Sequence, residues 1–590
     1  MNRMMKLWVM LILLTLGAGC TGILQEEPRG LLTPKYFETA QGLEGGVTAA
    51  YASLRYFYGT EAGNNLTVYG TDEFTNGNQV TNPPVNNYQN LVADQPDLLT
   101  PWNRAYPAIN TCNGVIELGP YVSELSEELK TNLISEAKFI RAQWYFILVQ
   151  TFGGVTLDLG SGPLKFNRTP SNQFSRATLE EVYEAIIQDL TDAVLGLPHT
   201  PRDPGRAWKA SALHLLAKVY LTRAWSEASQ PEDFERALAI AQDLIDNRAA
   251  YGVNLLDDFA DVFAEGNERN AEVLFVVERN GDVNFNIVDT QSGNNDANLQ
   301  QNRSNFFFRM FYTEFDGMVR DVENGRPWVR YKPTDWLLNE AFAQKNIDSR
   351  YEKSFQTVWI ANDPDPDQYP VWTENDAFSG YCEAEKVGKP RFYPGDTAVW
   401  FVPADLELTA DQIKSLGYAV LTPEYVSSQK GHFPSLCKFE ARERPIPGTE
   451  GDPNIASTRP YIVYRFAETY LIAAEAAHML GQNSLAANYL NAIRRRAAYP
   501  GQEAAMEISS AEVDLDFILD ERSRELAGEQ MRWFDLTRTQ RLIGRVQQYN
   551  PDGGPNIQPY HTLRPIPQSY IDLAVDPTTT DHKYPQNPGY

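Results

Sequence analysis

Cysteine and histidine are scarce in this chain of 590 residues, which has four cysteines and six histidines. This scarcity excludes a disulfide-stabilised scaffold and a dense Cys/His metal site. Beyond Cys20 the cysteines are Cys112, Cys382 and Cys437, an odd number, so at least one stays unpaired within the chain. Cys112 lies in an apolar periodic segment and is predicted to be a buried thiol. A pairing of Cys382 with Cys437 is left open.

Catalytic and nucleotide-binding motifs are also missing. No histidine begins an HExxH motif, and neither GxSxG nor GxxxxGK[ST] occurs. Asp363, Asp365 and Asp367 alternate as in a calcium loop, but prolines separate them and the required glycine and terminal glutamate are absent. A solvated turn is the favoured interpretation. We therefore predict no catalytic residue, no cofactor and no metal ion, although 77 acidic residues leave a glycosidase-type carboxylate pair open.

Basic residues are few relative to acidic ones: the chain has 51 Lys and Arg residues and 77 Asp and Glu residues, which gives a net charge of −26. Phosphate repels such an acidic chain, so no nucleic-acid partner is expected. The hydrophobic share of 43% and the aromatic share of 12% are sufficient for a sizeable folded core.

Hydrophobic runs long enough to span a bilayer are absent, since the most apolar stretch, residues 7–16, has ten residues. Arg3 and Lys6 precede this stretch, and small residues lead to Cys20. The pattern looks like a bacterial lipobox, which predicts a signal peptide over 1–19, cleavage before Cys20 and lipidation of Cys20. The alternative is an ordinary signal peptide with a chance cysteine.

Helical periodicity is strong in blocks. One apolar face over 129–151 ends at Gly153-Gly154, and a Thr178/Glu181 capping box opens the next segment. Helix pairs of about 34 residues with small residues at their crossings are similar to tetratricopeptide repeats, and an irregular helical bundle is the alternative. The other helices are predicted over 179–195, 207–225, 234–245, 461–480, 485–497 and 512–527.

Polar, irregular sequence interrupts these helices. Residues 64–90 and 280–305 contain eight asparagines each, and 327–460 is rich in Pro, Gly, Trp and Tyr. Long loops in compact domains usually have a function. We predict a lipidated extended arm over 20–45 and a single domain over 46–590. In that domain a helical scaffold (mainly 100–250 and 461–540) carries an irregular lobe (mainly 280–460).

Charged residues are dense over 518–538. Glu529 and Arg532, and likewise Asp535 and Arg538, are three residues apart, the spacing of ion pairs on a helix surface. Interleaved apolar residues favour a buried or half-buried structural network over a catalytic role, because no nucleophile is evident.

Several segments together resemble the SusD/RagB family of nutrient-binding outer-membrane lipoproteins of Bacteroidota. The similar segments are 141–157, 212–224, 464–476, 490–497, 518–538, 563–572 and 586–590. The resemblance implies an all-α fold, a tetratricopeptide-like right-handed helical superhelix with a large irregular, loop-rich ligand-binding lobe. It further implies a non-catalytic protein, anchored by lipid on the outer membrane, that captures an oligosaccharide for a SusC-like TonB-dependent transporter. Peptide capture, a surface glycoside hydrolase and a purely structural scaffold are the alternatives.

The ligand site is expected where the first Asn-rich loop meets the irregular lobe. Sugars bind aromatic platforms together with amide and carboxylate groups. Tyr88 and Trp328 are predicted as stacking platforms, with Trp359, Trp372 and Trp400 as the alternative location. The residues predicted to bond hydroxyl groups are Asp72, Asn78, Asn90, Asn284 and Arg326.

Overall fold

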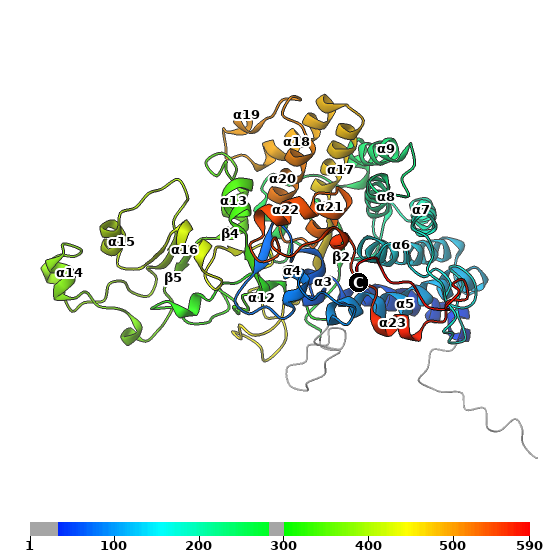
Figure 1. Ribbon diagram of the computed structural model, residues 1–590, viewed down its shortest axis with the longest axis horizontal. Helices are drawn as coiled ribbons and strands as arrows, with labels where there is room; N and C mark the ends of the chain where they lie inside the picture. The colour runs from blue at the N-terminus through cyan, green and yellow to red at the C-terminus, as the bar shows by residue number, and fades with distance from the viewer. Residues whose placement is uncertain (1–33, 283–299) are drawn as a thin grey trace, which may run out of the picture.

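Helices are the main regular elements of the computed structural model, which describes residues 34–282 and 300–590 (Figure 1). The predicted all-helical, tetratricopeptide-like class is confirmed. The longer helices are α2 (Ala40–Ser53), α5 (Pro96–Leu118), α6 (Glu127–Phe152), α7 (Leu179–Gly196), α8 (Lys209–Ala224), α9 (Asp233–Asp246), α17 (Phe466–Met479), α18 (Asn483–Ala497) and α20 (Leu515–Leu526). The shorter helices are α3 (Glu61–Thr67), α4 (Pro83–Asn87), α10 (Arg248–Tyr251), α12 (Ser304–Phe307), α13 (Arg350–Ser354), α14 (Glu374–Phe378), α15 (Ala410–Leu416), α16 (Pro423–Ser428), α19 (Glu503–Met506), α21 (Arg532–Arg538), α22 (Leu542–Tyr549) and α23 (Gln568–Leu573).

Successive helices pack as neighbours, from α2 on α5 through α6, α7 and α8 to α9. Local sequence explains these elements. Thr178 and Glu181 form the predicted capping box at α7, and α6 ends at Gly153, whose φ of 78° favours glycine. Helix α9 then packs on α17, more than two hundred residues later in the chain. The helical stack is therefore continuous in space although the sequence interrupts it.

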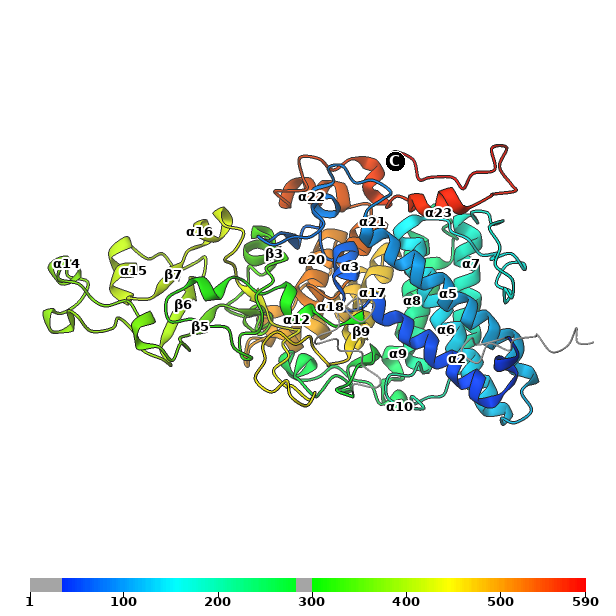
Figure 2. The same ribbon diagram turned by 90° about the horizontal axis from the view of Figure 1, so that it is seen from below.

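The interruption is bounded by two paired strands. β2 (Val273–Val277) and β9 (Tyr461–Arg465) are antiparallel, so the long insertion leaves and re-enters the helical stack at adjacent points. Part of it, with α14, α15 and a three-stranded sheet β5-β6-β7, projects from the helices as a separate lobe (Figures 1 and 2). The other strands are β1 (Phe74–Asn76), β3 (Tyr331–Pro333), β4 (Phe355–Gln356), β5 (Val358–Ile360), β6 (Thr397–Phe401), β7 (Ala419–Leu421) and β8 (Ser435–Leu436).

Two predicted boundaries are wrong. Residues 461–465 form strand β9 instead of the first turn of a helix, since Tyr461, Val463 and Tyr464 pack beside β2. The extended arm ends earlier than predicted, because α2 begins at Ala40 with Thr39 as its N-cap. Residues 1–33, including Cys20, lie outside the described residues.

A buried ion network joins the C-terminal helices to the insertion, as predicted for 518–538. Arg465 donates to Glu272, Glu525 and Glu529 at 2.7–2.9 Å, and Arg350 of the insertion contacts Glu525 at 3.0 Å. Asp535 and Arg538 pair at 2.8 Å as expected. The predicted Glu529–Arg532 pair is wrong, because Glu529 also binds Lys438 whereas Arg532 binds Asp72. Long-range partners displace this local pair in the core.

Cys112 is buried, as predicted, and Cys112, Cys382 and Cys437 are all free thiols. The Asp365 side chain accepts a hydrogen bond from the Asp367 backbone in a short turn. Within 34–282 and 300–590, no helix has the length and apolar character needed to cross a membrane, and no group of three or more acidic, His or Cys side chains could hold a metal ion.

Candidate functional site

The first Asn-rich loop and the insertion meet at a strand crossing. β1 pairs antiparallel with β3, so Asn76 lies opposite Tyr331. The pairing continues beyond the strands, because Gly77 N donates to Arg330 O at 2.9 Å and Gln79 N donates to Val329 O at 3.1 Å. The crossing brings two segments about 250 residues apart into direct contact, the junction at which a ligand site was expected.

Trp328 is held in this crossing by backbone bonds on its other side. Its N–H donates to Phe306 O at 3.2 Å, and Arg330 N donates to Phe307 O at 2.9 Å. Val329 between them has a φ of 49°, which is strained for a β-branched residue. Strained backbone is concentrated at functional sites. The arrangement places the Trp328 ring, half-buried, against Phe306 and Phe307.

Three arginines surround the Trp328 ring. The guanidinium carbons of Arg303, Arg326 and Arg330 lie 5.1, 5.1 and 4.9 Å from its centroid, within the range of cation–π contacts. Burial and the repulsion of Arg320 and Arg330 lower the pKa of the Arg326 guanidinium. We call Trp328 and these three arginines the Trp328 cluster.

A groove of about 560 Å³ adjoins the Trp328 cluster and shares Arg303 with it, whereas Trp328 itself is not a lining residue. We call it the Trp328 groove after the adjoining cluster. Helices α3 and α5 form one wall, and α3 lies between α5 and β3 (Figure 2). Arg104 covers the ring of Tyr56 in this groove at 3.7 Å. The apolar lining residues are Ala62, Pro96 and Leu99. The polar and aromatic lining residues are Tyr56, Thr60, Glu61, Thr81, Asn82, Gln95, Asp97, Thr100, Asn103, Arg104, Gln301 and Arg303.

Hydrogen bonds fix the polar side chains of the groove. Asp97 Oδ2 accepts from Asn65 Nδ2 and Asn82 Nδ2 at 2.7 Å each. Burial raises the pKa of the Asp97 carboxyl group, and the two amide donors oppose that rise. Glu61 Oε1 accepts from Arg330 Nε and Thr81 Oγ1 at 2.6 Å each. The groove therefore holds its donors and acceptors in place before any ligand arrives.

The structure brings some predicted site residues together. Arg326 and Trp328 are adjacent in the cluster. Asn78 is exposed and precedes Gln79, whose carbonyl accepts from Arg330. Asn284 lies outside the described residues.

Other predicted residues lie elsewhere. Asp72 is fully buried and accepts from Arg532 and Arg545, and Tyr88 is buried with its hydroxyl bonded to Gly70 O at 2.5 Å. Neither presents a surface to a ligand, so both are left out of the proposed site. Exposed Asn90 lines a different groove, beside Tyr560 and Tyr590 of the C-terminal segment.

Sequence reasoning missed several groove residues. Glu61, Tyr56 and Arg104 precede or follow the Asn-rich segment, and no motif marks them. One sequence pattern does indicate the adjoining cluster: Arg326 and Arg330 lie two residues before and two residues after Trp328. Two of the alternative tryptophans fit less well, because Trp359 is fully buried and Trp372 is 6% exposed, whereas Trp400 in β6 is half-buried.

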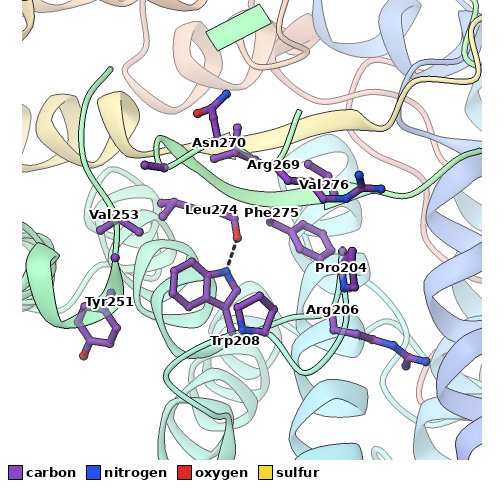
Figure 3. A pocket seen from close by; sticks show the side chains of 15 residues that line it. Pro204, Arg206, Trp208, Tyr251, Val253, Arg269, Asn270, Leu274, Phe275 and Val276 are labelled. Atoms are coloured by element: carbon purple, nitrogen blue, oxygen red, sulfur yellow. Dashed lines mark hydrogen bonds between the residues drawn. The ribbon is translucent and has the colours of Figure 1, made fainter. Parts of the chain in front are cut away.

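A second cavity, of about 350 Å³, lies between β2 and the segment before α8 (Figure 3). Its polar groups already have partners. The Trp208 indole donates to Leu274 O at 2.8 Å, Arg206 pairs with Glu136 at 3.0 Å, and Arg269 pairs with Glu278 at 2.6 Å. Because few groups are left for sugar hydroxyls, this cavity is a poorer candidate than the Trp328 groove.

Known proteins place the chain in a family. A family model described as "SusD family" matches residues 447–590, and one described as "Starch-binding associating with outer membrane" matches 41–221. SusD-like protein P2 of Formosa agariphila is 26% identical over 99% of both chains.

Solved structures agree in fold. A laminarin binding SusD-like protein superposes with a TM-score of 0.65 at 22% identity, covering 94% of this chain and 100% of its own. A SusD homologue from Bacteroides thetaiotaomicron gives a TM-score of 0.67 at 20% identity, with coverage of 94% and 98%. With both ends of its helical stack matched by models of one family and a full-length SusD-like relative, the chain belongs to the SusD family.

Proposed function

We propose that this protein is a cell-surface lipoprotein that binds an oligosaccharide in the Trp328 groove and delivers it to a TonB-dependent outer-membrane transporter. The single observation that carries the proposal is the groove beside the Trp328 cluster, which offers aromatic surface and fixed hydrogen-bonding groups between α3, α5 and residues 301–303 of the insertion. The name of a laminarin-binding relative and a family description that mentions starch support a glycan as the ligand.

The chemistry of the groove suits sugars. A sugar ring has apolar C–H faces and a rim of hydroxyl groups, so it requires both aromatic surface and fixed polar groups. Tyr56 supplies aromatic surface in the groove, and Trp328 supplies it in the adjoining cluster. Asn103, Gln301 and Arg104 supply polar groups. Membership of a family of binding proteins supports binding without turnover.

The outer-membrane location and the transporter are proposed on family grounds. The description of the model that matches 41–221 includes association with the outer membrane. The lipobox-like sequence before Cys20 supplies an anchor of the kind such a location requires.

Trp328→Ala tests the site. Loss of a central aromatic at a binding surface costs about 2 kcal/mol, roughly a thirtyfold loss of affinity. The purified protein is first screened on a glycan array, and the affinity for the best ligand is then measured by titration calorimetry. We expect Trp328→Ala to weaken binding at least that much, with no sugar product released over hours.

The matched control is Tyr121→Ala, which removes an aromatic that is 79% exposed and lies after α5, away from the groove. Its affinity should equal that of the unmodified protein. Equal affinity in the Trp328→Ala variant would place the ligand elsewhere. Binding to peptides but to no glycan would replace the proposed ligand class.

A further inference from the structure

The Trp328 cluster concentrates positive charge in an acidic protein. Arg303, Arg326 and Arg330 lie over one ring, and Arg320 is near enough for its charge to lower the pKa of Arg326. The chain as a whole carries a net charge of −26. The chain therefore contains more than enough carboxylates to pair with every arginine.

Among the described residues, one carboxylate pairs directly with Arg326 or Arg330. Glu61 binds Arg330 at 2.6 Å. Arg303 donates to the neutral amide oxygen of Gln301 at 2.8 and 3.0 Å, and Arg320 donates to that of Asn454 at 2.8 Å.

Arg326 is the distinctive member. Within 34–282 and 300–590, its guanidinium has no hydrogen bond and no ion pair, and its contact is the face of Trp328. The buried arginines of the core differ sharply: Arg350 and Arg465 each bind two or more carboxylates.

Burial and the repulsion of Arg320 and Arg330 oppose ionisation of Arg326, and they outweigh the attraction of the Asp452 charge, so the pKa of Arg326 is lowered. A guanidinium lying on an aromatic face keeps its N–H edge available, and that edge matches the two oxygens of a carboxylate or sulfate. An anionic group on the ligand would give Arg326 a directly bonded counterion.

We propose that the glycan bound at the Trp328 cluster is anionic, with carboxylate or sulfate groups paired to Arg326 and its neighbours. This inference rests on the proposed function and specifies its ligand class. Trp328 then has two tasks, since it contacts the ligand and supports the arginines.

Affinity electrophoresis of the detergent-extracted full chain tests the inference with three named polymers. Polygalacturonate presents carboxylates, dextran sulfate presents sulfates, and dextran is neutral. We expect retardation by one or both anionic polymers and none by dextran. The retardation should weaken as NaCl rises from about 0.05 M to about 0.5 M, since salt screens exposed charges. Retardation by polygalacturonate alone would identify uronic acid carboxylates as the anionic groups that the protein recognises. Retardation by dextran sulfate alone would identify sulfate groups.

Arg326→Gln should lower the affinity for the retained anionic polymer at least tenfold, and Arg326→Lys should recover part of it. Arg236→Gln is the matched control, because it removes one positive charge from exposed α9. Equal retardation of the Arg326→Gln and Arg236→Gln variants would overturn the inference. Binding of neutral glycans alone would also overturn it and leave the proposed function intact, whereas binding of no glycan would overturn both.

Discussion

Asp72 and Glu73 are adjacent buried carboxylates whose pKa values shift in opposite directions. Burial raises the pKa of both, but Arg532 and Arg545 bind Asp72 directly and bring its pKa below the ordinary value. Glu73 has a weaker contact, 3.6 Å from Arg532, and its Oε2 has no hydrogen-bond partner among the described residues. Burial therefore dominates and raises the pKa of Glu73 to about 7. Side chains of identical chemistry thus differ because of their partners.

Glu73→Gln should make stability less dependent on pH. Between the ordinary pKa of 4.5 and about 7, the folded protein holds a proton on Glu73 that the unfolded chain has released. Stability from this group therefore falls as pH rises through that window and is level above it. At pH 8 the free energy of unfolding of the variant should exceed that of the unmodified protein by roughly 3 kcal/mol.

Urea unfolding from pH 5 to pH 9 measures this difference. Asp72→Asn serves as the comparison, because removing a buried partner of two arginines should destabilise the protein by about 3 kcal/mol or more. A Glu73→Gln variant that is less stable than the unmodified protein at pH 8 would show that Glu73 is ionised and favourably paired.

At the scale of elements, the crossing of β1 and β3 positions the candidate site. The strands have three residues each, too few for independent stability, and their backbone bonds connect the Asn-rich loop with the Trp328 segment. Gly77 permits the close approach, since a Cβ there would lie 2.1 Å from Val329 O.

Gly77→Ala should therefore disturb both fold and binding. The strands must separate to admit the methyl group, which we expect to lower the free energy of unfolding by about 2 kcal/mol. It should also weaken glycan affinity, because Arg330 and Trp328 move with the strand. Thermal unfolding and calorimetry measure the two effects.

Gly544→Ala provides the control, since nothing lies within 4 Å of a Cβ at that position in α22. It should leave affinity unchanged and stabilise the helix by up to about 1 kcal/mol. If the Gly77→Ala variant binds glycan with unaltered affinity, the crossing of β1 and β3 does not position the binding site.

At the scale of the whole molecule, a helical stack carries a projecting lobe on an insertion whose ends are tied by β2 and β9. Helices α9 and α17 close the stack across this insertion. The insertion can therefore be elaborate without interrupting the core, and the candidate groove forms where it meets the helices α3 and α5.

Cys20→Ala should release the whole molecule from the membrane. The lipid on Cys20 is the anchor predicted from the sequence, and several acyl chains give stable attachment where one is marginal. Fractionation of cells should move the variant from the membrane to the soluble fraction, whereas Cys382→Ala should stay with the membrane. Mass spectrometry of the unmodified protein should find an acylated N-terminal Cys20, and an unacylated terminus would contradict the prediction.

Sequence patterns by themselves determined the helical class and most helix positions. The period of apolar residues predicts α6, α8 and α9 to within a few residues, and the Thr178 capping box marks α7, because these signals depend on neighbours three or four positions away. The similar segments over 141–224 and 464–590 pointed to the family, and two arginines beside Trp328 indicated part of the site.

Only the tertiary structure decided the partners and the exposure of each side chain. Asp72 and Tyr88 are side chains of the kinds that bind sugars, but both lie in the core. Glu529 binds Arg465 instead of Arg532. Contacts between residues far apart in the chain leave no local sequence pattern, so neither outcome could be predicted. Strand β9 replaces a predicted helical turn for the same reason, since β2 is its partner. Arg326 shows both contributions: the sequence places it two residues from Trp328, but only the folded chain brings its guanidinium over the Trp328 ring together with those of Arg303 and Arg330.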